Sequence, residues 1–250
     1  IDIKTDGSFR LNQDYFNYTT GLTMTNDKFH HLFGQNPRDV KKEKIAQFHM
    51  DIASSIQKVT EDIMLKISTS LRREFKIPNL CLAGGVALNC VANGKVYSEH
   101  IFDNIWIQPA SGDSGSAVGA ALAVWHQFLG KERVVSETDS MSGAYLGPCF
   151  SNTDIEKYLN ENSIPYERFA ENDLLDRVAD ELSSEMIIGW FQDKMEFGPR
   201  ALGNRSIIGD SRSPRMQSVM NLKIKYRESF RPFAPSVIRE KVNDFFEFND

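Results

Sequence analysis

The stretch NLCLAGGV, residues 79–86, decides the fold of the first half of the chain. Its apolar run is typical of a buried strand, and the paired glycines after it predict a tight turn. The next residues, 87–100, predict a helix, and DNIWIQ (103–108) predicts a second strand. The segment PASGDSGSAVGAALAVWHQFLG (109–130) predicts a loop followed by another helix. This repeated order of strand, glycine turn and helix indicates an α/β domain.

Upstream of this stretch, DIASSIQKVTEDIMLKISTSLRREF (51–75) predicts a long amphipathic helix, because its apolar residues recur every three or four positions. Pro78 follows and is expected to end it. The first 40 residues are polar and aromatic with little periodicity. They predict a strand or two followed by loop and turn.

Downstream, the polar and weakly patterned residues 131–146 are the expected linker between two domains. The elements predicted after it are a helix at 151–160 capped by Ser151, Asn152 or Thr153, a strand at 166–169, a helix at 173–184 and a strand at 186–191. We expect a first domain at 1–135 and a second at 136–250.

The composition predicts a soluble, cytoplasmic protein. The 250 residues are 41% hydrophobic with net charge −5. No apolar run approaches the roughly 20 residues that span a bilayer, and no basic-then-apolar leader opens the chain. Cys81, Cys90 and Cys149 form no CxxC pair and are expected to be buried, reduced thiols. The five histidines form no HExxH motif, so a histidine-based metal site within the chain is not expected.

Charge is distributed unevenly along the chain. Residues 191–241 carry eleven Lys and Arg against five Asp and Glu, a net of +6, which leaves −11 for the remainder. Nucleic-acid-binding proteins usually present a basic face across a whole domain. A local basic segment in an acidic chain therefore favours a small anionic ligand over nucleic acid.

The first candidate site is the turn LAGGVALN. Gly84 and Gly85 carry no side chain that would block a ligand, and the following helix directs free N–H groups toward the turn. Asn89 could bind a ribose or a base. The alternative is a tight strand–helix turn that serves packing alone. A P-loop is excluded, because no GxxxxGK[ST] motif occurs.

The second candidate is PASGDSGSAVGAAL, in which Gly112 and Asp113 begin a helix. Asp113 could cap that helix, or it could bind a divalent metal that positions a nucleotide phosphate. Two glycine-lined junctions in adjacent strand–helix units favour a nucleotide cleft.

The third candidate is the basic segment itself. Guanidinium groups bind phosphate or carboxylate through two parallel hydrogen bonds, and lysine adds a point charge. On a strand, alternating Lys223, Lys225 and Arg227 would share one face. A solvated charged face is the alternative, but the interleaved Gly, Pro and Phe favour anion binding. The candidates are Lys194, Arg200, Arg205, Lys223, Lys225, Arg227 and Arg231.

These motifs resemble the O-carbamoyltransferases of nodulation-factor and antibiotic biosynthesis. The resemblance covers nearly the whole chain and includes DIASSIQKVTEDIMLKI, NLCLAGGVALNCVANGKV, FDNIWIQPASGDSGSAVGAALA, AYLGP, MEFGPRALGNRSIIGDSRSP and NLKIKYRESFRPFAPSV. It implies the C-terminal part of an actin–hexokinase-like ATPase domain, which transfers the carbamoyl group. It also implies part of an α+β domain similar to threonylcarbamoyl-adenylate synthases, which forms carbamoyl adenylate.

The resemblance also implies an activity. Carbamoyl phosphate and ATP would give carbamoyl adenylate, whose carbamoyl group passes to a hydroxyl of a sugar-like or antibiotic acceptor. Alternatives are a related carbamoyl-adenylate enzyme, of the tRNA threonylcarbamoylation or hydrogenase-maturation type, and an inactive nucleotide- or anion-binding fragment. No nucleic-acid or membrane partner is expected, and a homodimer is left open.

Roles of single residues follow from the same resemblance. It implies that Gly84, Gly85, Asn89 and Gly112 contact the nucleotide and that Asp113 binds a divalent metal, iron or magnesium. The basic residues would hold ATP and carbamoyl phosphate, with Lys194, Arg200 and Arg205 catalytic and the group from Lys223 to Arg231 binding ATP. The family's HxxxH metal motif does not occur here. We therefore expect an internal portion of a longer enzyme, with the remaining metal ligands outside it.

Overall fold

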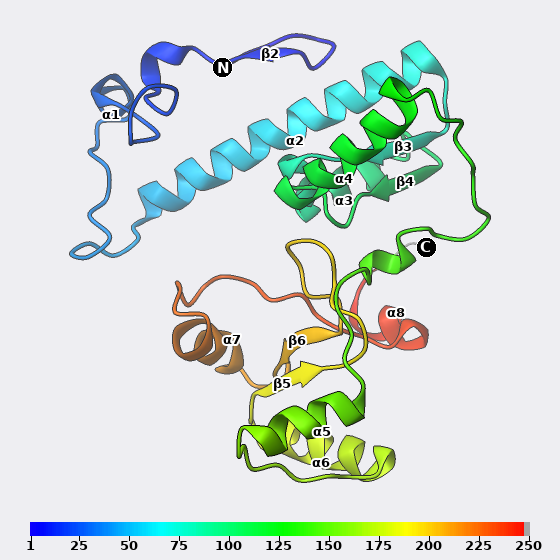
Figure 1. Ribbon diagram of the computed structural model, residues 1–250. Coiled ribbons are helices and arrows are strands. Elements are labelled where there is room, and N and C mark those ends of the chain that lie inside the picture. Colours follow the sequence, from blue (N-terminus) through cyan, green and yellow to red (C-terminus); the bar gives the residue numbers. More distant parts are fainter. Residues whose placement is uncertain (248–250) are drawn as a thin grey trace. The chain divides into compact units, whose positions relative to one another are not determined.

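The computed structural model describes residues 1–247. The chain divides into two compact units, unit 1 (Ile1–Val134) and unit 2 (Val135–Asp250). The helices and strands of unit 1 are β1 (Asp2–Ile3), β2 (Phe9–Arg10), α1 (Asp27–Phe33), α2 (Gln47–Phe75), β3 (Asn79–Leu82), α3 (Cys90–Ser98), β4 (Asn104–Ile107) and α4 (Asp113–Ala123). Those of unit 2 are α5 (Asn152–Glu161), α6 (Glu171–Ser183), β5 (Ile188–Phe191), β6 (Arg205–Ile208), α7 (Met216–Val219) and α8 (Val242–Phe245) (Figure 1).

The core of unit 1 confirms the predicted order of strand, turn and helix. β3 and β4 pair in parallel, with Leu80 opposite Ile105. Leu80 is buried in a cluster with Val96 of α3, and Met64 of α2 packs against that cluster. α2 and α3 thus cover the side of the sheet that carries Leu80. Because the two strands are parallel, the glycine turns that follow them lie at the same edge of the sheet.

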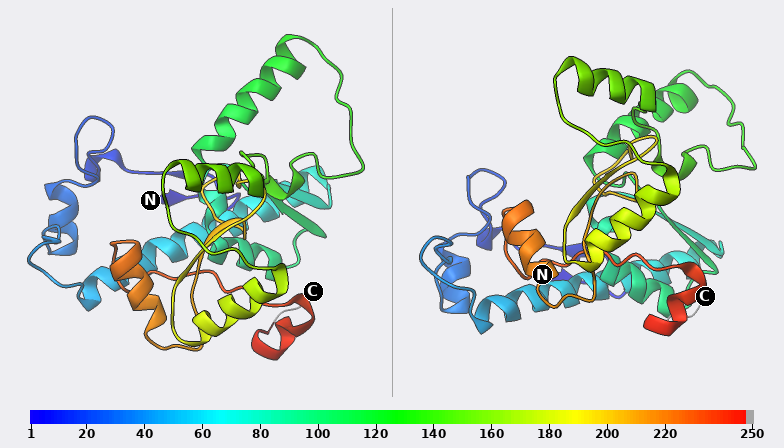
Figure 2. Two further views of the ribbon diagram at one scale, coloured as in Figure 1. Left: turned by 60° about the horizontal axis from the view of Figure 1, so that its bottom comes forward. Right: turned by 90° about the horizontal axis from the view of Figure 1, so that it is seen from below.

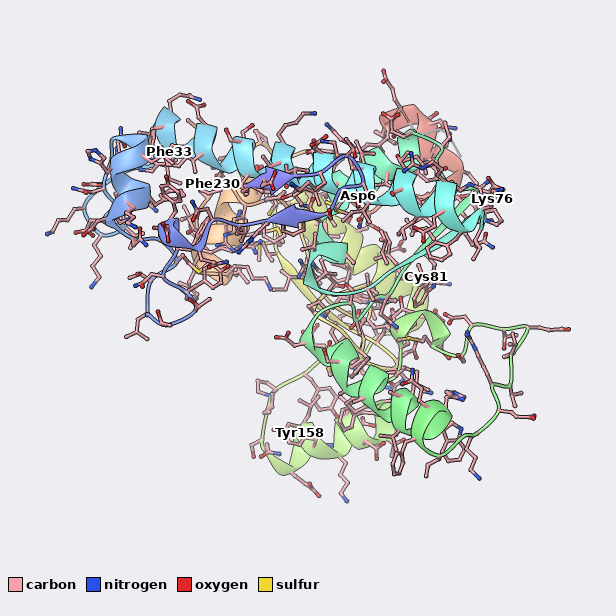
Figure 3. The ribbon with its side chains drawn as sticks, turned by 90° about the horizontal axis from the view of Figure 1, so that it is seen from above. Asp6, Phe33, Lys76, Cys81, Tyr158 and Phe230 are labelled. Carbon is pink, nitrogen blue, oxygen red and sulfur yellow. The ribbon has the colours of Figure 1, made fainter. Side chains whose placement is uncertain are left out.

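The opposite side of the β3–β4 pair carries Cys81, which is labelled in Figure 3. Cys81 lies opposite Trp106 in the strand register, and both side chains are exposed. Cys90 and Cys149 are free and exposed as well, so the expectation of buried thiols is wrong. The parallel sheet that the sequence predicts as buried has two strands and one covered face among the described residues. Cys81 therefore faces outward, since side chains alternate along a strand.

The long helix α2 begins four residues before the predicted start. His49 explains the earlier start, because its Nδ1 accepts a hydrogen bond from the N–H of Ala46 at 2.9 Å. The helix ends at Phe75, and Lys76 then adopts a left-handed conformation just before Pro78. Figure 3 shows Asp6 at the turn between β1 and β2, beside α2. These two strands, which pair antiparallel, fit the prediction of a strand or two in this region, whereas α1 lies where loop and turn were expected.

Unit 2 confirms three predicted elements and corrects another. α5, α6 and β5 lie where expected, and Ser151 caps α5 by accepting a hydrogen bond from the N–H of Asp154. Residues 166–169 contain no strand. Side chains hold this segment instead, because the Tyr166 hydroxyl donates to Glu156 at 3.0 Å. The polar segment 131–139 has no helix or strand and is extended (Figures 1 and 2).

β6 was not predicted, since its residues belong to the stretch expected as a turn. It pairs antiparallel with β5, with Trp190 opposite Ser206. Both units contain helices and strands, so the chain has a mixed α and β structure. Within residues 1–247 no helix has the length and apolar content needed to cross a bilayer.

Candidate functional site

The two glycine junctions of unit 1 lie at the same edge of the sheet. β3 and β4 are parallel neighbours, and the N–H of Gln108 donates to the carbonyl of Leu82 at 3.0 Å. A Cβ placed on Gly112 would stand 3.9 Å from Leu88 Cδ1. Leu88 belongs to the short 3-10 turn that follows Gly84. The structure therefore brings the LAGGVALN turn and the start of α4 together, as the nucleotide-cleft interpretation requires.

Gly84 is required by the backbone of this turn. Its φ is 93°, in a region that residues with side chains rarely adopt. Gly85 differs, because its φ lies outside that region and a Cβ there would meet nothing within 4 Å. The fold thus explains a glycine at 84 but gives no reason for one at 85. A ligand that approaches the backbone closely would give such a reason.

Asn89 is engaged within the protein. Its Oδ1 caps α3 by accepting the N–H of Ala92 at 3.1 Å. The same oxygen accepts from Gln57 Nε2 at 3.2 Å, and Asn89 Nδ2 donates to Gln57 Oε1 at 2.9 Å. One amide N–H of Asn89 is left for a ligand. These contacts favour a structural role for Asn89, which ties the turn to α2.

A buried carboxylate continues this connection between α2 and α3. Glu61 is 5% exposed, and its Oε2 lies 2.6 Å from Lys95 Nζ. Hydrogen bonds from Lys95 and then Gln57 lower the pKa of Glu61, and the bond to Glu61 raises the pKa of Lys95. Both groups therefore stay charged at neutral pH. They hold α3, and with it the glycine turn, against α2.

Asp113 is the first residue of α4, and its side chain is exposed. A carboxylate at this position is favourable with the helix dipole by about 0.3–1 kcal/mol. Within residues 1–247 no three His, Cys, Asp or Glu side chains gather in a way that could hold a metal. Next to Asp113, the Ser111 hydroxyl is buried and finds no hydrogen-bond partner in the described part of the chain.

The stretch EFGPRALGNRS in unit 2 folds around the carboxylate of Glu196. Its Oε1 accepts hydrogen bonds from the N–H groups of Leu202 at 2.7 Å, Asn204 at 2.8 Å and Arg205 at 3.2 Å. Burial raises the pKa of Glu196, but the backbone hydrogen bonds outweigh it and hold the pKa below its ordinary value. The carboxylate is thus ionised at neutral pH. Its stabilising contribution is lost only as the pH falls through that lowered pKa.

Arg205 lies at the base of this loop. Its guanidinium donates to the backbone carbonyls of Gln192, Asn204, Pro148 and Asp193. It also stacks on Phe191, 3.5 Å from the ring centre. Few of its donors are left for a ligand. These contacts favour a structural role for Arg205 over the anion-binding role expected from the sequence.

Arg200 and Lys194 differ from Arg205. Both side chains are exposed, and neither forms an ion pair within residues 1–247. Arg200 makes one weak hydrogen bond there, to the carbonyl of Pro199 at 3.5 Å. Glycines flank it, with φ of 137° at Gly198 and 113° at Gly203. The loop therefore presents the Arg200 guanidinium to solvent from a defined backbone.

The second basic segment folds around Asn221, which is fully buried. Asn221 Nδ2 donates to the carbonyls of Ser229 and Arg231, and its Oδ1 accepts from Arg227 Nε at 2.6 Å. Lys223 lies in the π-helical turn Met220–Ile224 and Lys225 directly after it. The predicted alternation along a strand is therefore wrong, because the chain coils to place Asn221 inside.

The ends of these basic side chains have different surroundings. Arg227 packs over Phe233, 4.9 Å from the ring centre, and Arg231 pairs with Glu228 at 2.8 Å. Lys223 and Lys225 are exposed and have no ion pair in the described range. In the described part of the chain, the two lysines are thus the cations of this segment whose charged groups have no contact of this kind, whereas Arg227 and Arg231 are engaged within the protein.

Replacing Asn221 with alanine is expected to destabilise unit 2 by about 2–3 kcal/mol, because it leaves two inward-facing carbonyls and the Arg227 Nε–H without their partner. Urea unfolding of the variant and of Asn160→Ala, an exposed asparagine on α5, would measure this. Equal stability of the two variants would contradict it.

Models of one protein family match both units. The family model described as carbamoyltransferase N-terminus matches residues 1–122, and the model described as carbamoyltransferase C-terminus matches residues 179–250. The chain belongs to the carbamoyltransferase family. The two models include the glycine junctions of unit 1 and the Glu196 and Asn221 segments of unit 2.

Several curated proteins are similar in sequence to this chain. The uncharacterized protein sll1178 of Synechocystis is 59% identical over 251 positions, covering 100% of this chain and 41% of that protein. Nodulation protein NolO of Bradyrhizobium diazoefficiens is 39% identical, covering 82% of this chain and 37% of that protein. Nodulation protein U of Rhizobium fredii is 34% identical, with 67% and 26% covered. The chain thus spans well under two thirds of the length of these relatives.

Sequence reasoning missed the buried groups that shape these sites: Glu196, Asn221 and the pair of Gln57 and Glu61. The signal for Glu196 was slight. Glu196 is an acidic residue inside a basic segment, and its neighbours were considered as anion-binding residues because of their positive charge. The signal for Gln57 and Glu61 was their polarity on a helix whose apolar pattern dominated the prediction.

Proposed function

We propose that the protein containing this chain is an ATP-dependent O-carbamoyltransferase. Carbamoyl phosphate and water give carbamate and phosphate. The carbamate oxygen attacks the α-phosphorus of ATP, which forms carbamoyl adenylate and releases pyrophosphate. A hydroxyl of a small acceptor then attacks the carbamoyl carbon. AMP leaves, and the hydroxyl proton is lost to a base. Adenylation is needed because the delocalised charge of carbamate makes it a poor electrophile.

The observation that carries this proposal is the Glu196 loop with its exposed Arg200, in a chain of the carbamoyltransferase family. Arg200 and Lys194 would bind the phosphate groups of carbamoyl phosphate or ATP. A guanidinium held toward developing negative charge stabilises it without reorganisation during the step. Lys223 and Lys225 would add positive charge for the ATP phosphates. Arg205, Arg227 and Arg231 would keep these segments in shape.

In unit 1, the paired glycine junctions would bind the nucleotide for carbamoyl transfer. Gly85 leaves room for a ligand against the backbone. The Ser111 hydroxyl, which finds no hydrogen-bond partner among residues 1–247, lies beside the start of α4. Both features fit a nucleotide. For a divalent metal, Asp113 is the candidate ligand, and within residues 1–247 it belongs to no group of three His, Cys, Asp or Glu side chains that could hold one. A single carboxylate does not make a metal site, so no step of the proposal passes through a metal.

Product analysis tests the proposed reaction. Incubation with ATP and carbamoyl phosphate should release pyrophosphate, and omission of either substrate should abolish this release. AMP should appear in equal amount once an acceptor hydroxyl, or water in its absence, has consumed the carbamoyl adenylate. Chromatography of the nucleotides with a pyrophosphate assay would measure this. Release of ADP would contradict the proposal, because it would indicate phosphoryl transfer to a substrate.

A further inference from the structure

Glu196 is a buried acid inside a segment that the proposed function assigns to anion binding. It is 6% exposed, and within residues 1–247 it forms no ion pair with a cation. Three backbone N–H groups compensate its charge, all of them directed at one oxygen. A buried charge is costly unless such partners are supplied. An acidic residue at this buried position therefore indicates a role other than packing.

The hydrogen bonds of Glu196 close the loop at its neck. The acceptor is residue 196 and the donors are residues 202, 204 and 205. These hydrogen bonds hold the two ends of the loop together, and residues 197–201 form the loop between them. Asn204 Nδ2 also donates to the carbonyl of Lys194 at 2.7 Å. From outside, the Tyr145 hydroxyl donates to the carbonyl of Leu202 at 2.7 Å. Arg200 lies in the closed part, with its guanidinium in solvent.

We propose that Glu196 is a positioning residue that holds the Arg200 loop in the form that binds the phosphate of carbamoyl phosphate. This inference rests on the proposed function. The charge matters as well as the shape, because hydrogen bonds to an ionised acceptor are roughly twice as strong as neutral ones. A glutamine would keep one oxygen for the three N–H groups and lose that strength.

Coulomb interaction and positioning make opposite predictions for this residue. Removal of a negative charge close to an anion site raises anion affinity if the loop keeps its shape. If Glu196 positions Arg200, removal of the same charge lowers anion affinity because the loop loosens. The sign of the change in affinity therefore separates the two effects. A merely structural role would lower the melting temperature and leave affinity measured well below that temperature unchanged.

The test compares Glu196→Gln with Asp193→Asn by titration calorimetry with carbamoyl phosphate. Asp193 is an exposed acid three residues away, and its side chain accepts none of the hydrogen bonds at the loop neck. E196Q should raise the Kd about tenfold, as the loss of charge assistance on three bonds predicts. D193N should leave the Kd unchanged or lower it. Hydrogen exchange at the N–H groups of residues 202, 204 and 205 should be faster in E196Q.

An unchanged or lower Kd for folded E196Q would overturn the inference and leave the proposed function standing. If wild-type protein binds neither carbamoyl phosphate nor ATP, the proposed function is wrong instead. Should E196Q fail to fold, as judged by circular dichroism, Glu196→Asp replaces it. The aspartate keeps the charge but is one methylene shorter, so weaker binding than wild type supports positioning and equal binding overturns it.

Discussion

Alanine at position 200 is expected to lower kcat/KM for carbamoyl phosphate by about 100-fold or more, which is the usual loss when one charged donor at a reacting centre is removed. Arg200 is exposed and makes one weak hydrogen bond within residues 1–247. Its removal should therefore leave the melting temperature unchanged. Steady-state kinetics of AMP release, with thermal unfolding as the check on folding, measures both effects.

Arg200→Lys distinguishes the guanidinium group from its charge. Lysine keeps the charge but cannot form two parallel hydrogen bonds with a phosphate, so it should recover activity only in part. Arg177→Ala is the matched control, because Arg177 is an exposed arginine of unit 2 that pairs with Glu181 on the same helix. If Arg200→Ala lowers kcat/KM by less than threefold, the loop is a solvated charged surface and not an anion-binding site.

The turn around Arg200 illustrates what local patterns can establish about backbone conformation. Glycine and proline around an arginine indicate a shaped turn, and the structure has this turn with positive φ at Gly198 and Gly203. The same reasoning placed Arg205 beside Arg200 as an equal candidate. Its contacts with four carbonyls depend on chain segments that meet only in the folded unit, such as Pro148. The spacing of residues along the sequence does not show which segments contact each other in the folded unit.

The fold was predictable to a similar extent. α5, α6 and the β3–β4 pair have strong local patterns and were found close to their predicted positions. β6 was missed because its residues followed a glycine-rich turn and its partner strand lies across the loop. Lys223 and Lys225 alternate as strand residues would, but burial of Asn221 coils the chain there. In these last two cases, contacts between residues that are not neighbours in the sequence decided the structure against the local pattern.

Valine at position 85 is expected to raise the Kd for AMP, the nucleotide part of carbamoyl adenylate, on the order of 30-fold without lowering the melting temperature, and alanine there should raise it less. A Cβ at Gly85 meets nothing within 4 Å in the protein, and its φ lies outside the region that favours glycine. The fold therefore tolerates a side chain. A nucleotide packed against this backbone does not, because added side-chain atoms in a close-packed contact cost about 1–3 kcal/mol.

Gly119→Ala on α4 is the matched control, since a Cβ there also meets nothing within 4 Å. It should leave AMP binding unchanged and stabilise the helix slightly. Gly84 is a poorer test, because its φ of 93° would strain any side chain whether or not a ligand is present. Binding of labelled AMP and thermal unfolding separate the two causes. If Gly85→Val binds AMP as tightly as wild type, the turn serves packing alone, and the nucleotide site of unit 1 has to be sought elsewhere.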